Sequence, residues 1–445
     1  MINNEISRRR LLGLGAGLGA AGALTLAGCG GKSASDTGGS TSGGNGGKDY
    51  TGPKVSLKLW NGFTGGDGDI FKKLVDQFNS EHQNIAVTPA TYEWADYYAK
   101  LPGAVSSGNG PDIAVMHMDQ LATFAARKVI MPLDDVASAL GLSEGDFAPT
   151  VWKGGIYQDK RYGIPLDMHP LGFYYNKSVM QKAGLDPEKP PTNRQEYEAA
   201  LAALKKSGVQ GFWVSPFQFT GGMTAYSVIN QFGGSLFDQG AQSATFNADP
   251  AVEAVTWLVD MIKQGYSPAN VGQDADYLAF KAGKNAFNWN GIWQINDLKK
   301  SPNVQWGVAP VPQIGSKQGV WANSHNFTIV QQRSADNNKI AGAKVFINWL
   351  SQHSLDWGKG GQVPARKAVR ESSDFTALPD ISKLAPELEY AAFPPAVPGL
   401  GDVLTIFYDS FNAAVLGKQQ PKQAMDAGAA KANKLLEDNR KKYGS

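Results

Sequence analysis

The stretch that decides the predicted fold is VSLKLW at residues 55–60, in which apolar and polar side chains alternate. Alternation with a period of two indicates a strand. A Gly-rich loop follows, and apolar residues then recur at helical spacing over 70–78. The series continues with a strand at 85–88, a helix around 97–105 and a strand at 112–116. This order predicts an α/β fold with a largely parallel sheet covered by helices.

The second half of the chain repeats this mixture of strands and helices. Asp249 and Pro250 begin a helix that Gly265 ends. Thr192 and Gln195 fit a capping box that opens another helix. Further strands are predicted at 211–214, 286–289, 307–311 and 327–330, and further helices at 339–352 and 421–443. About 390 residues of such material exceed one core, so we expect two lobes.

The N-terminus has the features of an export signal. Three arginines at 8–10 precede an apolar, Gly-rich run over 11–27 that is too short for a good membrane span. The chain's one cysteine, Cys29, follows in a context that resembles the lipobox of bacterial lipoproteins. We therefore predict a signal peptide over 1–28, lipidation of Cys29 and a flexible Gly/Ser linker over 29–49. The arginines also resemble a twin-arginine motif, and both Tat and Sec export stay open.

Charge and residue spacing exclude several function classes. With 42 Lys+Arg against 40 Asp+Glu, the chain lacks the basic balance expected of a nucleic-acid binder. No two of the five histidines share a helix turn, so neither a metal nor a cofactor is predicted. A glycosidase stays open, because its two carboxylates can come from any part of the chain.

Aromatic and amide side chains gather where strands are predicted to end. The relevant segments are 60–67, 289–293 and 321–325, in a chain with 11 Trp. In open α/β sheets, ligands bind beyond the carboxyl ends of the strands. A sugar ring offers an apolar face to an aromatic ring and a rim of hydroxyls to amides and carboxylates. The pattern favours a sugar, although core packing of most of the Trp residues is the simpler alternative.

Nine short segments occur in an order that carries a family resemblance. They are 59–63, 110–116, 131–134, 162–167, 174–177, 183–187, 190–192, 290–293 and 364–366. In this order, behind a lipobox, they resemble the bacterial extracellular solute-binding proteins of family 1, the sugar-binding lipoproteins of ABC importers. The resemblance covers essentially all of residues 54–440.

The resemblance implies a two-lobed periplasmic-binding-protein-like fold of type II, with hinge crossovers and a ligand cleft between the lobes. The N-terminal lobe is expected to comprise 50–165 and 318–366, and the C-terminal lobe 166–317 and 367–445. The chain would cross near 163–167, 313–320 and 362–370. Closure of the hinge over the ligand would be the signal that the importer detects.

The resemblance and the strand-end pattern together give a set of candidate ligand-binding residues. They are Phe63, Thr64, Asp67, His117, Asp119, Asp167, Phe217, Asn290, Trp293, Ser324, His325 and Asp402. By the resemblance, Trp293 would stack on the ligand and Asp167 would be the hinge acid that accepts hydrogen bonds from hydroxyls. Glu93 and Trp94 are weaker candidates at the cleft rim.

Structural roles remain alternatives for several of these residues. Asp67 has the neighbours of a turn residue, and Asp119 stands where a helix N-cap would be. His117 and His325 fit satisfied structural histidines, and Phe217 fits core packing.

The predicted function is that of a monomeric, lipid-anchored extracytoplasmic receptor that captures a neutral sugar or oligosaccharide and delivers it to ABC permease subunits. It would catalyse no reaction. The alternatives are a lipid-anchored glycosidase, or the same fold binding a glycerol phosphate or a polyamine. The nominated loops contain no Arg or Lys, which favours a neutral ligand over an anion.

Overall fold

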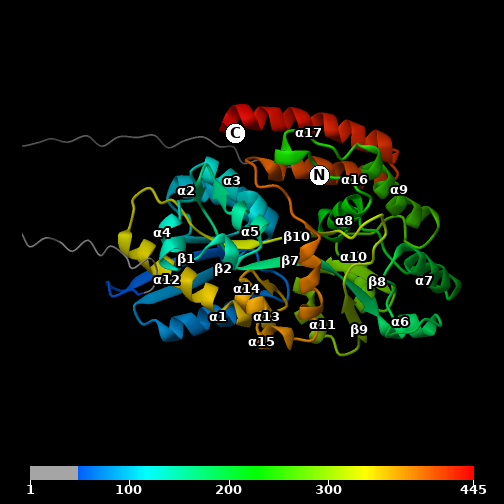
Figure 1. Ribbon diagram of the computed structural model, residues 1–445, viewed down its shortest axis with the longest axis horizontal. Helices are drawn as coiled ribbons and strands as arrows, with labels where there is room; N and C mark the ends of the chain where they lie inside the picture. The colour runs from blue at the N-terminus through cyan, green and yellow to red at the C-terminus, as the bar shows by residue number, and fades with distance from the viewer. Residues whose placement is uncertain (1–48, 445) are drawn as a thin grey trace, which may run out of the picture. The chain divides into compact units, whose positions relative to one another are not determined.

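A computed structural model describes residues 49–444 (Figure 1). The predictions for the signal peptide at 1–28, for Cys29 and for the linker up to residue 48 lie outside this range. Within it, no helix combines the length and the apolar character needed to cross a bilayer.

The first sheet contains the alternating strand predicted at residues 55–60. Its strands are β1 (Val55–Asn61), β2 (Ile85–Thr91), β3 (Ile113–His117), β6 (Ile164–Pro165) and β11 (His325–Ile329), in the order β2-β1-β3-β11-β6. β1 is parallel to β2 and β3, whereas β11 runs antiparallel to β3 and β6. In β1, Val55, Leu57 and Leu59 are buried and Ser56 is exposed, which confirms the predicted alternation.

Seven helices and one hairpin accompany this sheet. They are α1 (Gly68–Glu81), α2 (Trp94–Ser107), α3 (Met118–Ala126), α4 (Asp134–Ala139), α5 (Pro149–Gly154), the hairpin β4 (Ile156–Tyr157) with β5 (Lys160–Arg161), α12 (Asn337–Gln352) and α13 (Ser354–Lys359). α1 buries Phe71, Leu74 and Phe78 along one stripe, as helical spacing predicts.

The second sheet is built around a strand that the sequence pattern did not predict. Its strands are β7 (Asp167–Asn176), β8 (Phe287–Gly291), β9 (Trp306–Ala309), β10 (Val320–Asn323), β12 (Val363–Pro364) and β13 (Ala391–Ala392). β7 pairs antiparallel with β8, β9, β10 and β12. All of β7 is buried, so it shows no alternation between apolar and polar residues.

The remaining helices accompany the second sheet. They are α6 (Lys177–Lys182), α7 (Arg194–Lys206), α8 (Met223–Gln231), α9 (Asp249–Lys263), α10 (Ala275–Lys281), α11 (Ile295–Lys299), α14 (Lys367–Arg370), α15 (Ser373–Thr376), α16 (Leu400–Val415) and α17 (Pro421–Tyr443). Figure 1 shows α16 and α17 lying side by side, in orange and red.

Two local predictions were wrong. Asn193, not Thr192, caps α7, because the Asn193 side chain accepts a hydrogen bond from the Glu196 backbone at 3.1 Å. The Glu196 carboxylate in turn accepts from the Thr192 backbone at 2.8 Å, so the N-cap lies one residue further along the chain than predicted. The strand expected at 211–214 is reduced to a single bridge between Phe212 and Phe287.

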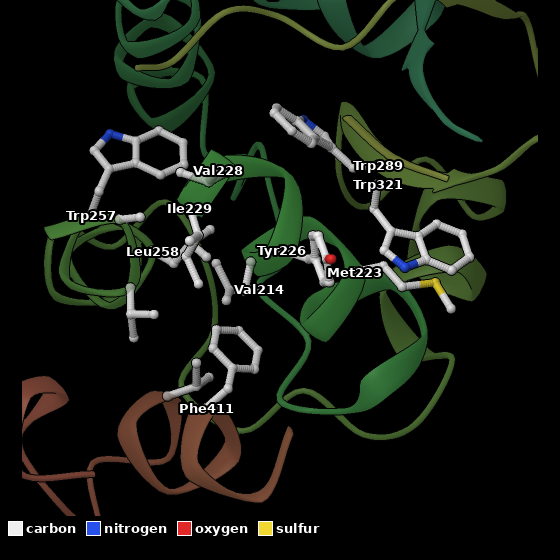
Figure 2. Close-up of a cluster of buried hydrophobic side chains, with 14 of the residues drawn as sticks. Val214, Met223, Tyr226, Val228, Ile229, Trp257, Leu258, Trp289, Trp321 and Phe411 are labelled. Carbon is white, nitrogen blue, oxygen red and sulfur yellow. The ribbon is translucent and has the colours of Figure 1, made fainter. Parts of the chain in front are cut away.

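A large apolar cluster packs between the second sheet and its helices (Figure 2). Ile229 of α8, Leu258 of α9 and Phe411 of α16 are essentially buried in it. Each such side chain contributes about 1.5–3 kcal/mol by leaving water. Met223 and Trp321 lie at one edge of the cluster in Figure 2, and both also line the cavity described below. The core therefore holds part of the site in place.

The chain crosses between the two sheets at short connections. β6 leads into β7 through Leu166, and β10 leads into β11 through Ser324. The second crossing falls later than the expected 313–320, because β10 still pairs with β7 through Asn323 and His169. A third connection, from α13 to β12, covers residues 360–362. The predicted residue boundaries of the lobes otherwise remain predictions.

Candidate functional site

A cavity of about 510 Å³ opens where the ends of the two sheets meet. From the first sheet's side it is lined by Gly62, Thr64, Gly65, Gly66, Asp67, Asp69, Glu93, Trp94, His117 and His325. From the second sheet's side it is lined by His169, Phe219, Thr220, Met223, Gln273, Asp274, Tyr277, Asn290, Trp293, Gln294, Asp297, Lys300 and Trp321. We call this space the cleft.

A second cavity of about 420 Å³ adjoins the cleft. The two share five lining residues, namely Trp94, His117, Phe219, Met223 and Trp321. Because the same side chains border both spaces, the cleft and this side cavity are neighbours, and we call them together the groove.

Half of the candidate residues meet at the cleft. They are Thr64, Asp67, His117, Asn290, Trp293 and His325. Two more, Asp119 and Asp402, line only the side cavity. Asp119 does not cap α3: its side chain makes no capping bond and instead accepts from Asn323 at 2.8 Å.

Four candidate residues line neither cavity. Phe63 is buried against Phe71 and Trp357, and Ser324 is buried within the crossing. Phe217 is 37% exposed but lies outside both cavities, whereas Phe219, two residues later, lines both. Asp167, the predicted hinge acid, is fully buried and is treated separately below.

Two tryptophans are placed in the cleft by glycines. A Cβ atom on Gly291 would lie 2.1 Å from the Trp293 ring, and one on Gly62 would lie 2.1 Å from the Trp94 ring. Such contacts do not occur between real atoms, so each ring lies directly on bare backbone. Gly62 follows β1 and Gly291 ends β8, so both sheets supply one ring at a strand's carboxyl end. The segments singled out in the sequence therefore bring aromatic surface into the cleft.

Three histidines meet at the back of the cleft, although they are far apart in the sequence. Ring nitrogens of His117, His169 and His325 lie within 4.8 Å of one another. The rings of His169 and His325 are stacked, with centroids 4.1 Å apart and an angle of 24° between the planes. His117 contacts Tyr98 through Nδ1, at 2.8 Å from the hydroxyl. Sequence spacing gave no sign of this cluster.

These histidines are the described residues best suited to hold a metal, but the stacking opposes it. A metal binds imidazole nitrogen in the plane of the ring, at about 2.0–2.1 Å. In a stacked pair the in-plane lone pairs run side by side and do not meet at one point. The arrangement suits two separate hydrogen bonds better than one ion.

Asp167 is enclosed by donors. Its carboxylate accepts from His169 Nδ1 at 3.0 Å, His325 Nδ1 at 2.8 Å, the His325 backbone N–H at 2.9 Å and Trp357 Nε1 at 2.6 Å. Burial alone would raise the pKa of the Asp167 carboxyl, but the contacts with His325 and His169 hold it well below its ordinary value. It is thus a buried carboxylate with no face toward the cleft.

Asp67 is a buried carboxyl that does border the cleft. Its Oδ2 accepts from Gln362 Nε2 at 3.0 Å, and its Oδ1 has no hydrogen-bond partner. Gln362 lies 295 residues further along the chain, so this bond is not the local side-chain-to-backbone contact that a turn residue makes. Burial raises the pKa of the Asp67 carboxyl to about 6, and the charge of Asp167 adds to this, while His325 opposes it.

The charged groups of the cleft are mainly acidic. Five carboxylates line it, those of Asp67, Asp69, Glu93, Asp274 and Asp297. Among the described residues that line it there is no arginine, and the one lysine, Lys300, forms an ion pair with Asp69. Asp297 is paired with Lys281 at 2.8 Å. Lys300 was not among the residues predicted from the sequence, and its ion pair with Asp69 neutralises it.

Sequence reasoning left out several lining residues, of which His169, Phe219, Tyr277 and Trp321 are the most prominent. A signal existed for His169, because it stands two residues after Asp167 and side chains at i and i+2 share a face of a strand. Trp321 lies in a segment noted for its aromatic residue. Phe219 and Tyr277 come from a loop and a helix that no pattern linked to the strand ends.

Two mixed sheets joined by crossings, with an aromatic and acidic cleft where they meet, define an α/β ligand-binding protein of the periplasmic-binding-protein fold. The family model described as bacterial extracellular solute-binding protein matches residues 64–354. The chain belongs to this family, whose members are binding receptors of ABC transporters and not enzymes.

Relatives and solved structures agree with this assignment. The chain is 25% identical over 409 residues to the sn-glycerol-3-phosphate-binding periplasmic protein UgpB of Escherichia coli (strain K12), covering 86% of this chain and 92% of that one. The GacH receptor of Streptomyces glaucescens, solved with acarbose, is 22% identical with a TM-score of 0.77, over 87% of this chain and 100% of that one. Maltose-bound MalE3 of T. maritima is 21% identical with a TM-score of 0.75, over 86% and 100%.

Proposed function

We propose that the protein captures a neutral sugar, and preferably an oligosaccharide, in the cleft, closes over it and delivers it to the permease of an ABC importer. One observation carries this proposal. The cleft contains both tryptophan rings that lie on glycine backbone and buried polar atoms that have no hydrogen-bond partner. Trp94 and Trp293 offer ring faces, on which the apolar face of a sugar stacks.

The cleft also contains polar atoms that a ligand could pair with. Asp67 Oδ1, His169 Nε2 and Trp321 Nε1 are buried and have no hydrogen-bond partner, and all three residues line the cleft. Buried polar groups are normally paired, because leaving one unpaired costs about 1–3 kcal/mol. Hydroxyl groups both donate and accept, so a sugar's rim can satisfy acceptors and donors together.

The charge of the cleft favours a neutral ligand over a phosphate. A phosphate monoester needs arginine, lysine or free backbone N–H groups around it. The cleft's one lysine, Lys300, is already paired, and Glu93, Asp274 and the buried Asp67 add negative charge. On this ground, the glycerol-phosphate ligand named for the relative from Escherichia coli does not transfer to this chain.

The size of the groove favours more than one sugar unit. The cleft and the side cavity have volumes of about 510 and about 420 Å³ and share a wall of Trp94, Phe219 and Trp321. Ligand pockets of about 300–1,000 Å³ suit drug-sized molecules. The solved neighbours named above were crystallised with acarbose and with maltose.

The proposal includes the ligand contacts and the anchor. We assign direct contacts to Thr64, Asp67, His117, Asn290, Trp293 and His325, with lobes divided near the predicted boundaries. Cys29 carries the lipid that tethers a monomeric receptor outside the cytoplasm. A Cys29→Ser protein should appear in the soluble extracytoplasmic fraction and take up no labelled fatty acid, whereas an unchanged membrane fraction would contradict the anchor.

The experiment that tests the ligand class is a thermal-shift and calorimetry screen of a protein starting near Asp49. The panel contains neutral mono- and oligosaccharides, sn-glycerol 3-phosphate and a polyamine. A ligand at 100 times its Kd should stabilise the fold by about 2.7 kcal/mol. A response confined to one sugar family supports the proposal. A response to glycerol phosphate or polyamine, with none to sugars, overturns it.

A further inference from the structure

The stacked pair of His169 and His325 is held by a single carboxylate that faces away from the cleft. Both oxygens of Asp167 accept hydrogen bonds from the two Nδ1 atoms, at 3.0 and 2.8 Å. An ionised carboxylate accepts but never donates. Both Nδ1 atoms must therefore carry a hydrogen.

The other ring nitrogen is then left as an acceptor. In a neutral imidazole with Nδ1–H, Nε2 has a lone pair and no hydrogen. His169 Nε2 is buried without a partner, and both histidines line the cleft. Burial, and next the neighbouring His325, lower the pKa of His169 to about 4, which keeps this ring neutral at neutral pH.

His117 presents the opposite character. The Tyr98 hydroxyl accepts from the His117 backbone N–H at 2.9 Å and lies 2.8 Å from His117 Nδ1. When the hydroxyl donates its hydrogen to Nδ1, His117 Nε2 is the N–H side of its ring. The back of the cleft then combines two acceptors with one donor.

We infer that Asp167 is a positioning residue that fixes His169 and His325 as two adjacent acceptors for a pair of neighbouring ligand hydroxyls. This inference rests on the proposed function and names the group that the cleft selects. Because the rings are stacked at 4.1 Å, their lone pairs lie side by side. Neighbouring hydroxyls on a sugar ring can each donate one hydrogen to such a pair. A fully ionised phosphate group has no hydrogen to donate and is disfavoured at this pair.

The inference changes the role expected from the resemblance. Asp167 was predicted to accept directly from a ligand, but four protein donors already occupy its oxygens. The acceptors that border the cleft are the Nε2 atoms of His169 and His325, whose rings Asp167 orients. A carboxylate that orients a histidine through the far ring nitrogen is a common arrangement behind functional histidines.

The first test needs neither ligand nor variant. Nitrogen-15 NMR of the imidazole rings distinguishes an Nδ1–H ring from an Nε2–H ring. At pH 7, His169 and His325 should both show the Nδ1–H form and His117 the Nε2–H form. The rings of His82 and His353, which lie outside both cavities, serve as references. An Nε2–H form at His169 or His325 overturns the inference even if sugars bind.

The second test is Asp167→Asn. An amide has one acceptor and one donor, so it must turn one of the two imidazoles into its other tautomer. The Kd for the sugar should rise about tenfold, the amount expected for one lost hydrogen bond. A ligand analogue lacking one of the two hydroxyls should bind more weakly to the natural protein, yet no more weakly to the variant. His353→Asn is the matched control.

The surroundings define the expected pH profile. The titratable groups that face the pair are Asp167 beneath it, Asp67 from the loop after β1 and His117 from the end of β3. Protonating His169 Nε2 removes an acceptor, so the affinity for the sugar should fall as the pH approaches 4. This fall should be weaker in Asp167→Asn. Equal profiles would leave Asp167 a merely structural role and overturn the inference.

Two further outcomes are informative. Stoichiometric Zn²⁺ binding that depends on His117, His169 and His325 and strengthens sugar binding would overturn the inference, because the lone pairs would serve an ion. If no sugar binds the natural protein while NMR shows the expected tautomers, the proposed sugar ligand is wrong. The two acceptors are then supported, and they pair with a different donor.

Discussion

The two walls of the cleft differ in chemistry. The wall from the first sheet is polar, with Thr64, Asp67, Glu93 and two histidines, and has one large aromatic ring, Trp94. The wall from the second sheet is richer in apolar rings, with Phe219, Tyr277, Trp293 and Trp321. One wall is therefore suited to pairing with hydroxyls and the other to stacking, so a ligand that uses both walls needs both kinds of surface.

The largest expected effect is on the aromatic wall. Trp293→Ala should raise the Kd for the sugar about 30-fold, since losing a stacking ring costs about 2 kcal/mol. Calorimetry on the two proteins measures this directly. Trp306→Ala, at a half-buried ring on β9 outside both cavities, is the control and should keep its affinity. Full sugar affinity in Trp293→Ala would refute the main site assignment.

The next effect tests the polar wall. Asp67→Asn should raise the Kd about tenfold, because an acceptor in the cleft is replaced by an amide. The same change should increase thermal stability at pH 7. Burial raises the pKa of this carboxyl to about 6 from an ordinary value of 3.8, which corresponds to about 3 kcal/mol between its neutral and ionised forms.

The sign of the pH dependence follows from that shift. Between pH 4 and 6 the folded protein holds a proton on Asp67 that the unfolded chain has lost, so stability falls as the pH rises. Asp67→Asn should lose this part of the slope. Asp69→Asn, at an exposed carboxylate in the first turn of α1, should not. Melting curves at pH 4.5 and 7 decide between these outcomes, and parallel slopes in both variants would contradict the assignment.

A smaller effect concerns how each ring is seated. Gly291→Ala places a methyl group against the Trp293 ring and should weaken binding about fivefold without unfolding the protein, at a cost of about 1 kcal/mol. In a Trp293→Ala background the same change should cost almost nothing. Gly62→Ala offers the matched experiment at Trp94. Additive losses at Gly291 and Trp293 would show that the glycine acts by another route.

The smallest effects are expected where the sequence nominated residues outside the cleft. Phe217→Ala should leave affinity for a short sugar unchanged, because Phe217 lines neither cavity. Asp402→Ala, on the side cavity, should matter only for longer oligosaccharides. Titrations with a mono- or disaccharide beside a longer homologue make this comparison. A marked loss of affinity for the short sugar in either variant would contradict the cleft boundaries described above.

The sequence predicted the first sheet well and the second sheet less well. Strand β1 alternates because one face is buried. Among the helices beside the second sheet, α17 was nevertheless predicted with its observed ends. Strand β7 is buried on both faces, so it has no period to detect. The site residues also differ in how far a local sequence pattern predicts them. Trp293 stands in a recognisable strand-end segment. His117 and His325 are ladder partners on β3 and β11, His169 comes from β7 of the second sheet, and no local pattern links these three strands.

The third connection between the sheets has a consequence for energy transfer. Trp357 of α13 donates to Asp167 at 2.6 Å, and Gln362 donates to Asp67 at 3.0 Å. One short stretch of chain thus holds both buried carboxylates beside the cleft, and any turn of this stretch alters the two hydrogen bonds together. If the proposed closure bends this stretch, occupancy of the cleft and the angle of the hinge are thermodynamically linked. A permease that changes the hinge angle would then change the affinity for the ligand by the same coupling free energy.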